Sequence, residues 1–172
     1  ELKPFSKFYA VQFKSTNEHV IGIISQKSNS KEPFLSNNFF EISVYTKNNL
    51  DEFNDSINLS QWEAANKILG NLYLKSKDTE KYRPLEINYD ELRVSFDKGC
   101  YRGQEIVARM KYLGIDRRKF CTFITEKSFE FHKDIKIAGE VIELDNNRIF
   151  NGIIKRDCLS DMQNLDGIID IY

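Results

Sequence analysis

The chain has 172 residues, of which 41% are hydrophobic and 30% are charged, and its formal net charge is −1. A chain of this length and composition can bury a core as one domain or two small ones, which excludes a wholly disordered protein. The lack of an apolar run near 18 residues excludes a membrane-spanning helix, and the balanced charge excludes a globally basic nucleic-acid binder.

Three strands are expected at the start of the chain. Residues 8–13 and 39–46 alternate apolar and polar side chains, and residues 19–25 form an apolar run typical of a more fully buried strand. A short helix is expected around residues 50–57. The chain therefore opens with a predicted sheet.

A helix is predicted over residues 60–70. Ser60 and Glu63 have the spacing of a capping box, and Gly70 stands where a C-terminal cap is needed. Its expected buried face consists of Trp62, Ala65 and Leu69. Residues 75–90 are predicted to form a loop, because Pro84 biases the residue before it away from helix.

A second helix is predicted for "GQEIVARMKYLG", residues 103–114, whose apolar residues recur at helical spacing. From residue 118 onward the pattern changes to four short strands separated by turn residues: "RKFCTFIT", "DIKIAGEVIEL", "RIFNGIIK" and "DGIIDIY". The sequence therefore predicts an α+β protein, with an α+β domain over residues 1–116 and a small antiparallel β-barrel or sandwich over residues 117–172.

The three cysteines, Cys100, Cys121 and Cys158, fit neither a disulfide framework nor a C-x-x-C pair. Their spacing matches no iron–sulfur ligand pattern either, and no metal site is predicted. We expect a reducing, cytoplasmic compartment. Since the chain begins with Glu1 and has no signal peptide, it is expected to be a fragment, a processed form or a shortened version of a longer protein.

Cys100 lies just before the second predicted helix, in "DKGCYRGQE". Backbone N–H groups at a helix start, together with Lys98 and Arg102, would stabilise a thiolate, and Gly99 and Gly103 would let the chain turn sharply. The alternative is a buried thiol that acts as a small hydrophobic residue, as most free cysteines do. A Cys–His hydrolase is less favoured, because neither histidine lies in a recognisable motif.

A local basic excess surrounds Cys100. Residues 98–119 carry seven basic and two acidic side chains. The candidate anion-binding residues are Arg102, Arg109, Arg117 and Arg118. They could hold a polyglutamyl tail or an RNA phosphate, although a solvated helix face explains the same pattern. Glu86 could accept hydrogen bonds from the N–H groups of a heterocycle; considered alone, it would be a surface glutamate.

"KGCYRGQEIVAR", residues 98–109, resembles the K-G-C-Y-x-G-Q-E signature of the YgfZ-type folate-binding proteins, which are relatives of the glycine-cleavage aminomethyltransferase. Trp62, the stretch from Pro84 to Asp90 and the basic run at 117–119 are similar to the family in the same order, so that the resemblance covers about residues 5–155. It implies α+β subdomains around a central folate cleft, with a C-terminal β-barrel at one side. Family members usually carry a further domain-sized segment upstream, which is expected to be absent here.

The resemblance also implies function. It implies binding of tetrahydrofolate or a derivative, and a role in the assembly or repair of iron–sulfur enzymes, including ones that thiolate tRNA. Cys100 matches the functionally important cysteine of the signature, and Glu86 matches a position that faces the pterin. The remaining candidate cofactor-binding residues are Lys98, Tyr101, Gln104 and Glu105.

The leading hypothesis is therefore an accessory protein without a defined turnover reaction, with folate and iron–sulfur enzymes or their assembly proteins as partners and no membrane. A tetrahydrofolate-dependent aminomethyltransferase is one alternative, but that enzyme family does not show the signature. An RNA-binding module is another, and it would need aromatic stacking residues beside the basic ones.

Overall fold

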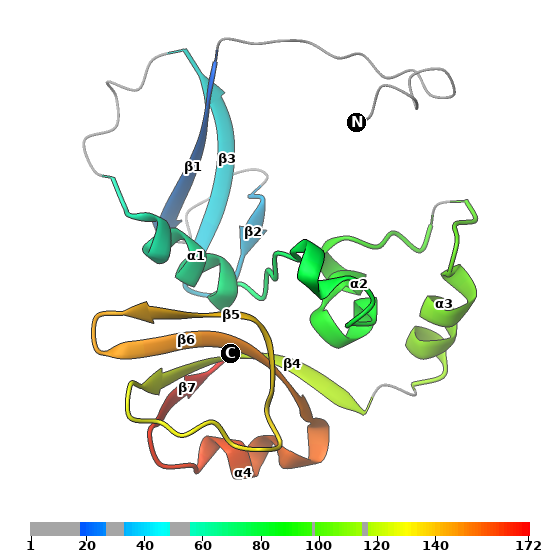
Figure 1. The fold of residues 1–172 in the computed structure, drawn as a ribbon. Coiled ribbons are helices and arrows are strands. Elements are labelled where there is room, and N and C mark those ends of the chain that lie inside the picture. Colours follow the sequence, from blue (N-terminus) through cyan, green and yellow to red (C-terminus); the bar gives the residue numbers. More distant parts are fainter. Residues whose placement is uncertain (1–17, 27–32, 49–55, 98, 115–116) are drawn as a thin grey trace. The chain divides into compact units, whose positions relative to one another are not determined.

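The computed structural model describes residues 18–26, 33–48, 56–97, 99–114 and 117–172. The chain divides into two compact units, residues 1–56 and 57–172. Each unit contains an antiparallel sheet, and the helices of the described residues belong to the second unit (Figure 1). The predicted α+β class is confirmed. The predicted boundary near residue 116 falls inside the second unit and stays a prediction.

The described part of the first unit is a three-stranded sheet in the order β1-β3-β2. Its strands are β1 (His19–Gln26), β2 (Leu35–Ser36) and β3 (Phe40–Lys47). These confirm the strands predicted at 19–25 and 39–46, whereas residues 8–13 and most of 50–57 lie outside the described residues. The expectation that 19–25 is a more fully buried strand was wrong, because among the described residues β1 is an edge strand and none of its eight residues is buried.

The second unit is built on a four-stranded sheet in the order β5-β6-β4-β7. Its strands are β4 (Arg118–Glu126), β5 (Lys136–Leu144), β6 (Asn147–Lys155) and β7 (Ile168–Ile171). All four coincide with the predicted strands. The expected barrel is not closed, since within the described residues β5 pairs with β6, β7 pairs with β4, and β5 and β7 form the two edges.

The sheet of the second unit is covered on both faces. On one face, Phe123 and Phe150 stack with ring centroids 5.2 Å apart, and Met162 of α4 (Leu159–Gln163) packs in the same cluster. On the other face, Leu72 and Ile87 pack against residues of β4, β5 and β6. α1 and α4 accordingly lie on opposite sides of the sheet (Figure 1). A sheet with both faces already covered has no apolar face left that closure into a barrel would bury.

Helix α1 (Leu59–Ile68) begins one residue earlier than predicted and has a different cap. Asn58 Oδ1 accepts the N–H of Gln61 at 2.9 Å, while the N–H of Asn58 donates to Gln61 Oε1 at 2.9 Å. This pair forms the capping box, and the predicted box of Ser60 and Glu63 was wrong because both residues lie inside the helix. Gly70 follows the helix with φ +72°, as a C-terminal cap requires.

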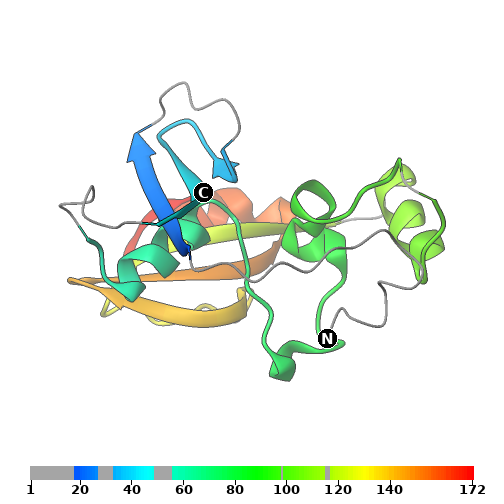
Figure 2. The same cartoon turned by 90° about the horizontal axis from the view of Figure 1, so that it is seen from above.

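The segment predicted as a loop over 75–90 contains short helical turns. They are η2 (Ser76–Asp78), η3 (Pro84–Ile87) and α2 (Tyr89–Leu92), and a further 3-10 turn, η4 (Arg156–Cys158), precedes α4. Pro84 begins η3, where its fixed φ is favourable and its missing N–H costs nothing. The predicted second helix is confirmed as α3 (Gln104–Tyr112). Seen from above, α1 and α3 lie at opposite ends of the unit (Figure 2).

No helix in the described part of the chain has the length and apolar character needed to cross a membrane.

Candidate functional site

Cys100 is exposed in the loop that leads into α3. The alternative of a buried thiol is therefore wrong. Gly103 supplies the turn: its φ is +88°, a left-handed conformation that favours glycine, and the N–H of Gln104 donates to Tyr101 O at 3.1 Å. Gly103 thus provides the sharp turn that was expected of it.

Helix α3 supports this loop through its buried face. Val107 and Met110 pack against Leu85 of η3, with Phe96 at the edge of the cluster. Lys111 lies over the Phe96 ring, with its Nζ 4.1 Å from the centroid. Because burial of these apolar residues fixes α3 to η3, the preceding loop is presented from a packed helix.

Glu86 is not a surface residue, in contrast to the expectation from its local sequence. Only 10% of its side chain is exposed, and its Oε1 accepts a hydrogen bond from Arg118 Nη1 at 2.9 Å. Its Oε2 accepts the backbone N–H of Arg83 at 3.3 Å. Both carboxylate oxygens are thus engaged by donors of the chain itself, and a ligand at Glu86 would have to compete with Arg118.

The candidate residues form two groups at opposite ends of α3. Cys100 precedes the helix, whereas Glu86 and Arg118 meet near the start of β4. In the chain, α3 with its 9 residues lies between Cys100 and Arg118. Tyr101 and Gln104 are half-buried and Glu105 is exposed in the first group, while Lys98 lies outside the described residues.

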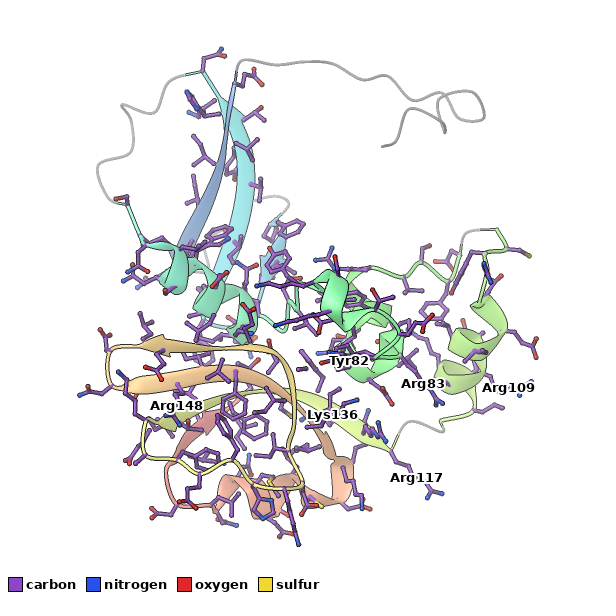
Figure 3. The ribbon with its side chains drawn as sticks, viewed as in Figure 1. Tyr82, Arg83, Arg109, Arg117, Lys136 and Arg148 are labelled. Atoms are coloured by element: carbon purple, nitrogen blue, oxygen red, sulfur yellow. The ribbon has the colours of Figure 1, made fainter. Side chains whose placement is uncertain are left out.

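The candidate anion-binding arginines differ in what they contact. Arg109 forms an ion pair with Glu105 at 2.7 Å, and Arg118 forms one with Glu86. Arg102 and Arg117 are exposed. Arg109 projects outward from α3, and Arg117, the residue before β4, also projects outward (Figure 3). Two of the four guanidinium groups are therefore partly neutralised by neighbouring carboxylates.

The other two cysteines lie in a different environment. Cys121 is 1% exposed on β4, and burial raises the pKa of its thiol. Cys158 is half-buried against the aromatic cluster of the sheet. Among the described residues, no group of three or more His, Cys, Asp or Glu side chains gathers as a metal site would require.

A scan against protein-family models finds no match. An uncharacterised protein of Haemophilus influenzae is 29% identical over 175 residues, which cover 98% of this chain and 58% of that protein. The tRNA-modifying protein YgfZ of Blochmanniella pennsylvanica is 30% identical over 118 residues, or 66% of this chain and 35% of that protein. The chain belongs to the YgfZ-like family. The YgfZ of Klebsiella pneumoniae is likewise 34% identical over 116 residues, or 65% of this chain and 34% of its own length.

The resemblance to YgfZ-type proteins is thus confirmed, and the chain spans about a third of the length of these two YgfZ proteins.

Sequence reasoning overlooked one residue of this YgfZ-like chain, Lys67. It is 8% exposed, whereas lysine side chains are almost never buried in proteins unless they are paired. No local pattern in α1 distinguishes this lysine, because its partner Asn151 lies 84 residues further along the chain.

Proposed function

We propose that the chain is part of a cytoplasmic, folate-binding accessory protein that supports assembly or repair of iron–sulfur enzymes, including tRNA-modifying ones. The observation that carries the proposal is the exposed thiol of Cys100 within the K-G-C-Y-x-G-Q-E signature. Membership in a family whose named relatives are tRNA-modifying proteins supports it.

In this proposal Cys100 is the reacting group, and it briefly holds sulfur, iron or a partner thiol. Its exposure gives a macromolecular partner access, and the positive end of the α3 dipole favours a negative sulfur close to the helix start. An accessory role of this kind requires no turnover reaction.

The folate part of the proposal concerns the pair of Glu86 and Arg118. A pterin presents N–H donors, which suit a carboxylate, and the glutamyl tail of a folate presents carboxylates, which suit a guanidinium. The two side chains now pair with each other at 2.9 Å. Folate binding would replace the Glu86–Arg118 pair by one contact between each side chain and the ligand. Because Glu86 is already buried in the free protein, the free-energy cost of burying its carboxylate would not be added on binding.

The deciding experiment is complementation of a bacterial strain that lacks its own YgfZ, with the activity of an iron–sulfur enzyme that thiolates tRNA as the readout. Cys100→Ser should abolish complementation while thermal stability stays nearly unchanged, because an exposed loop thiol contributes little to the core. Cys158→Ser is the matched control and should complement. A Cys100→Ser protein that restores the enzyme would remove the thiol from the proposed function.

RNA binding is the second candidate, and the exposed guanidinium groups of Arg102 and Arg117 favour it. Each phosphate contact contributes to the salt dependence of affinity, so that the double variant Arg102→Gln, Arg117→Gln should reduce the salt slope of tRNA binding by roughly two. If the double variant binds tRNA with an unchanged slope, RNA contact through these arginines is excluded.

A further inference from the structure

A pocket lies between α1, the segment 71–78 and β5, and its space, counted together with the part open to solvent, is about 450 Å³. It belongs entirely to the second unit and involves neither α3 nor η3. Its charged lining residues are Glu63, Lys67, Lys75, Lys77, Asp78 and Glu140. The lining thus mixes three basic and three acidic side chains, and does not form a single-sign site for a free anion or cation.

Lys67 is the buried charged group of this pocket. Its Nζ donates to Asn151 Oδ1 at 3.3 Å, and Asn151 has no exposed surface. The amide nitrogen of Asn151 donates in turn to Thr122 Oγ1 at 2.8 Å and to the backbone carbonyl of Lys67 at 3.2 Å. This network fixes the direction of the lysine side chain, because Asn151 is held from two strands and by the helix that carries the lysine.

Gly139 keeps the amine open to the pocket. A Cβ at this position would lie 3.8 Å from Lys67 Nζ and 2.7 Å from Leu72 Cδ1. Its φ of +75° also favours glycine. A larger residue at position 139 would collide with Leu72 and fill the space beside Lys67 Nζ. The glycine leaves that space empty.

Two lysines of the pocket differ in their electrostatics. Burial lowers the pKa of Lys67, with a contribution from Lys75, while the carboxylates of Glu63 and Glu140 act in the opposite direction. Lys75 instead has a raised pKa, because it donates a hydrogen bond to Glu140 at 2.6 Å. Glu140 also pairs with Lys77 at 3.3 Å. Lys75 thus keeps its proton to a higher pH than Lys67 does.

We propose that this pocket binds a small aldehyde and that Lys67 Nζ forms a reversible imine with it. The neutral amine attacks the carbonyl carbon, a C–N bond forms, and a proton passes from nitrogen to oxygen to give a carbinolamine. Loss of water leaves the imine, and addition of water reverses the reaction, so that no oxidant or reductant is consumed. Glu63 lines the same pocket as a carboxylate that can accept and return the proton, whereas Glu140 is paired with Lys75 and Lys77. This proposal does not depend on Cys100 or on folate.

The test is reductive trapping with propionaldehyde and cyanoborohydride, followed by peptide mass spectrometry of each lysine. In the folded protein near neutral pH, Lys67 should be alkylated several-fold faster than Lys75 and Lys77, which line the same pocket and serve as internal controls. In concentrated urea the preference should vanish, because both the burial and the pocket are lost. Lys67→Arg should leave the labelling of the two rim lysines unchanged.

Equal or slower alkylation of Lys67 than of Lys75 in the folded protein would overturn the proposal. Alkylation of Lys67 that appears only after unfolding would overturn it as well, since the amine would then be closed to the pocket.

Discussion

Replacing Arg118 by methionine should destabilise the protein more than replacing Glu86 by glutamine, although the two side chains form one ion pair. Arg118 is 50% exposed, so that water can solvate its guanidinium when the Glu86 charge is removed, whereas the Glu86 side chain is only 10% exposed. Without Arg118, the nearly buried carboxylate of Glu86 would keep a single long hydrogen bond, which its Oε2 accepts from the backbone N–H of Arg83 at 3.3 Å.

An uncompensated buried carboxylate costs about 2–3 kcal/mol, while loss of a pair with a half-exposed partner costs about 1 kcal/mol. At about 2–4 °C for each kcal/mol in a protein of this size, Arg118→Met should lower the Tm by about 4–12 °C. Glu86→Gln should lower it by about 2–4 °C. Both variants lose the 2.9 Å ion pair. The difference between their Tm values therefore comes from the different burial of the two side chains.

Urea unfolding of both single variants and of the double variant measures the effect, and the double-mutant cycle isolates the coupling between the two side chains. Arg117→Met is the matched control, because Arg117 is an exposed neighbour that should change stability by less than about 0.5 kcal/mol. The reasoning is refuted if Arg118→Met costs no more than Glu86→Gln, or no more than the control.

Two further predictions concern Lys67 and the thiols. Because the folded pKa of Lys67 is lowered from 10.5, the unfolded chain binds more protons between the lowered pKa and 10.5, and stability should rise with pH through this window. Lys67→Met should lose that rise in unfolding experiments at several alkaline pH values; an identical pH dependence in both proteins would contradict the assignment. Iodoacetamide should label Cys100 first, Cys158 more slowly and Cys121 only on unfolding, because their exposure falls in this order. Labelling of Cys158 ahead of Cys100 near neutral pH would exclude Cys100 as the most reactive thiol.

Local pattern was sufficient to predict most elements of the second unit. The four strands and α3 were predicted close to their observed bounds, because apolar periodicity and turn residues are properties of neighbouring positions. Closure of the sheet was predicted wrongly. It depends on what covers each face, and Leu72 and Ile87, which cover one face, come from segments whose packing no local pattern reveals.

The buried face of α1 shows the same limit. Trp62 and Leu69 were expected to be buried, but the buried residues are Ala64, Ala65, Asn66 and Lys67. A lysine is normally solvated, and the partner that keeps Lys67 inside, Asn151, follows 84 residues later. Helical periodicity contains no information on such a partner.

The candidate site was predicted residue by residue but not as an arrangement. Glu86 and Arg118 were selected for separate reasons, one for a pterin and one for an anion, and the structure pairs them across 32 positions. The turn η3 connects this pair to the thiol loop, because its Leu85 packs against Val107 and Met110 of α3 while the adjacent Glu86 reaches β4. Two neighbouring residues of η3 therefore have different partners: Leu85 packs against α3, the helix that follows Cys100, and Glu86 pairs with Arg118. A ligand that separated Glu86 from Arg118 would therefore act on the same short turn whose Leu85 packs against α3.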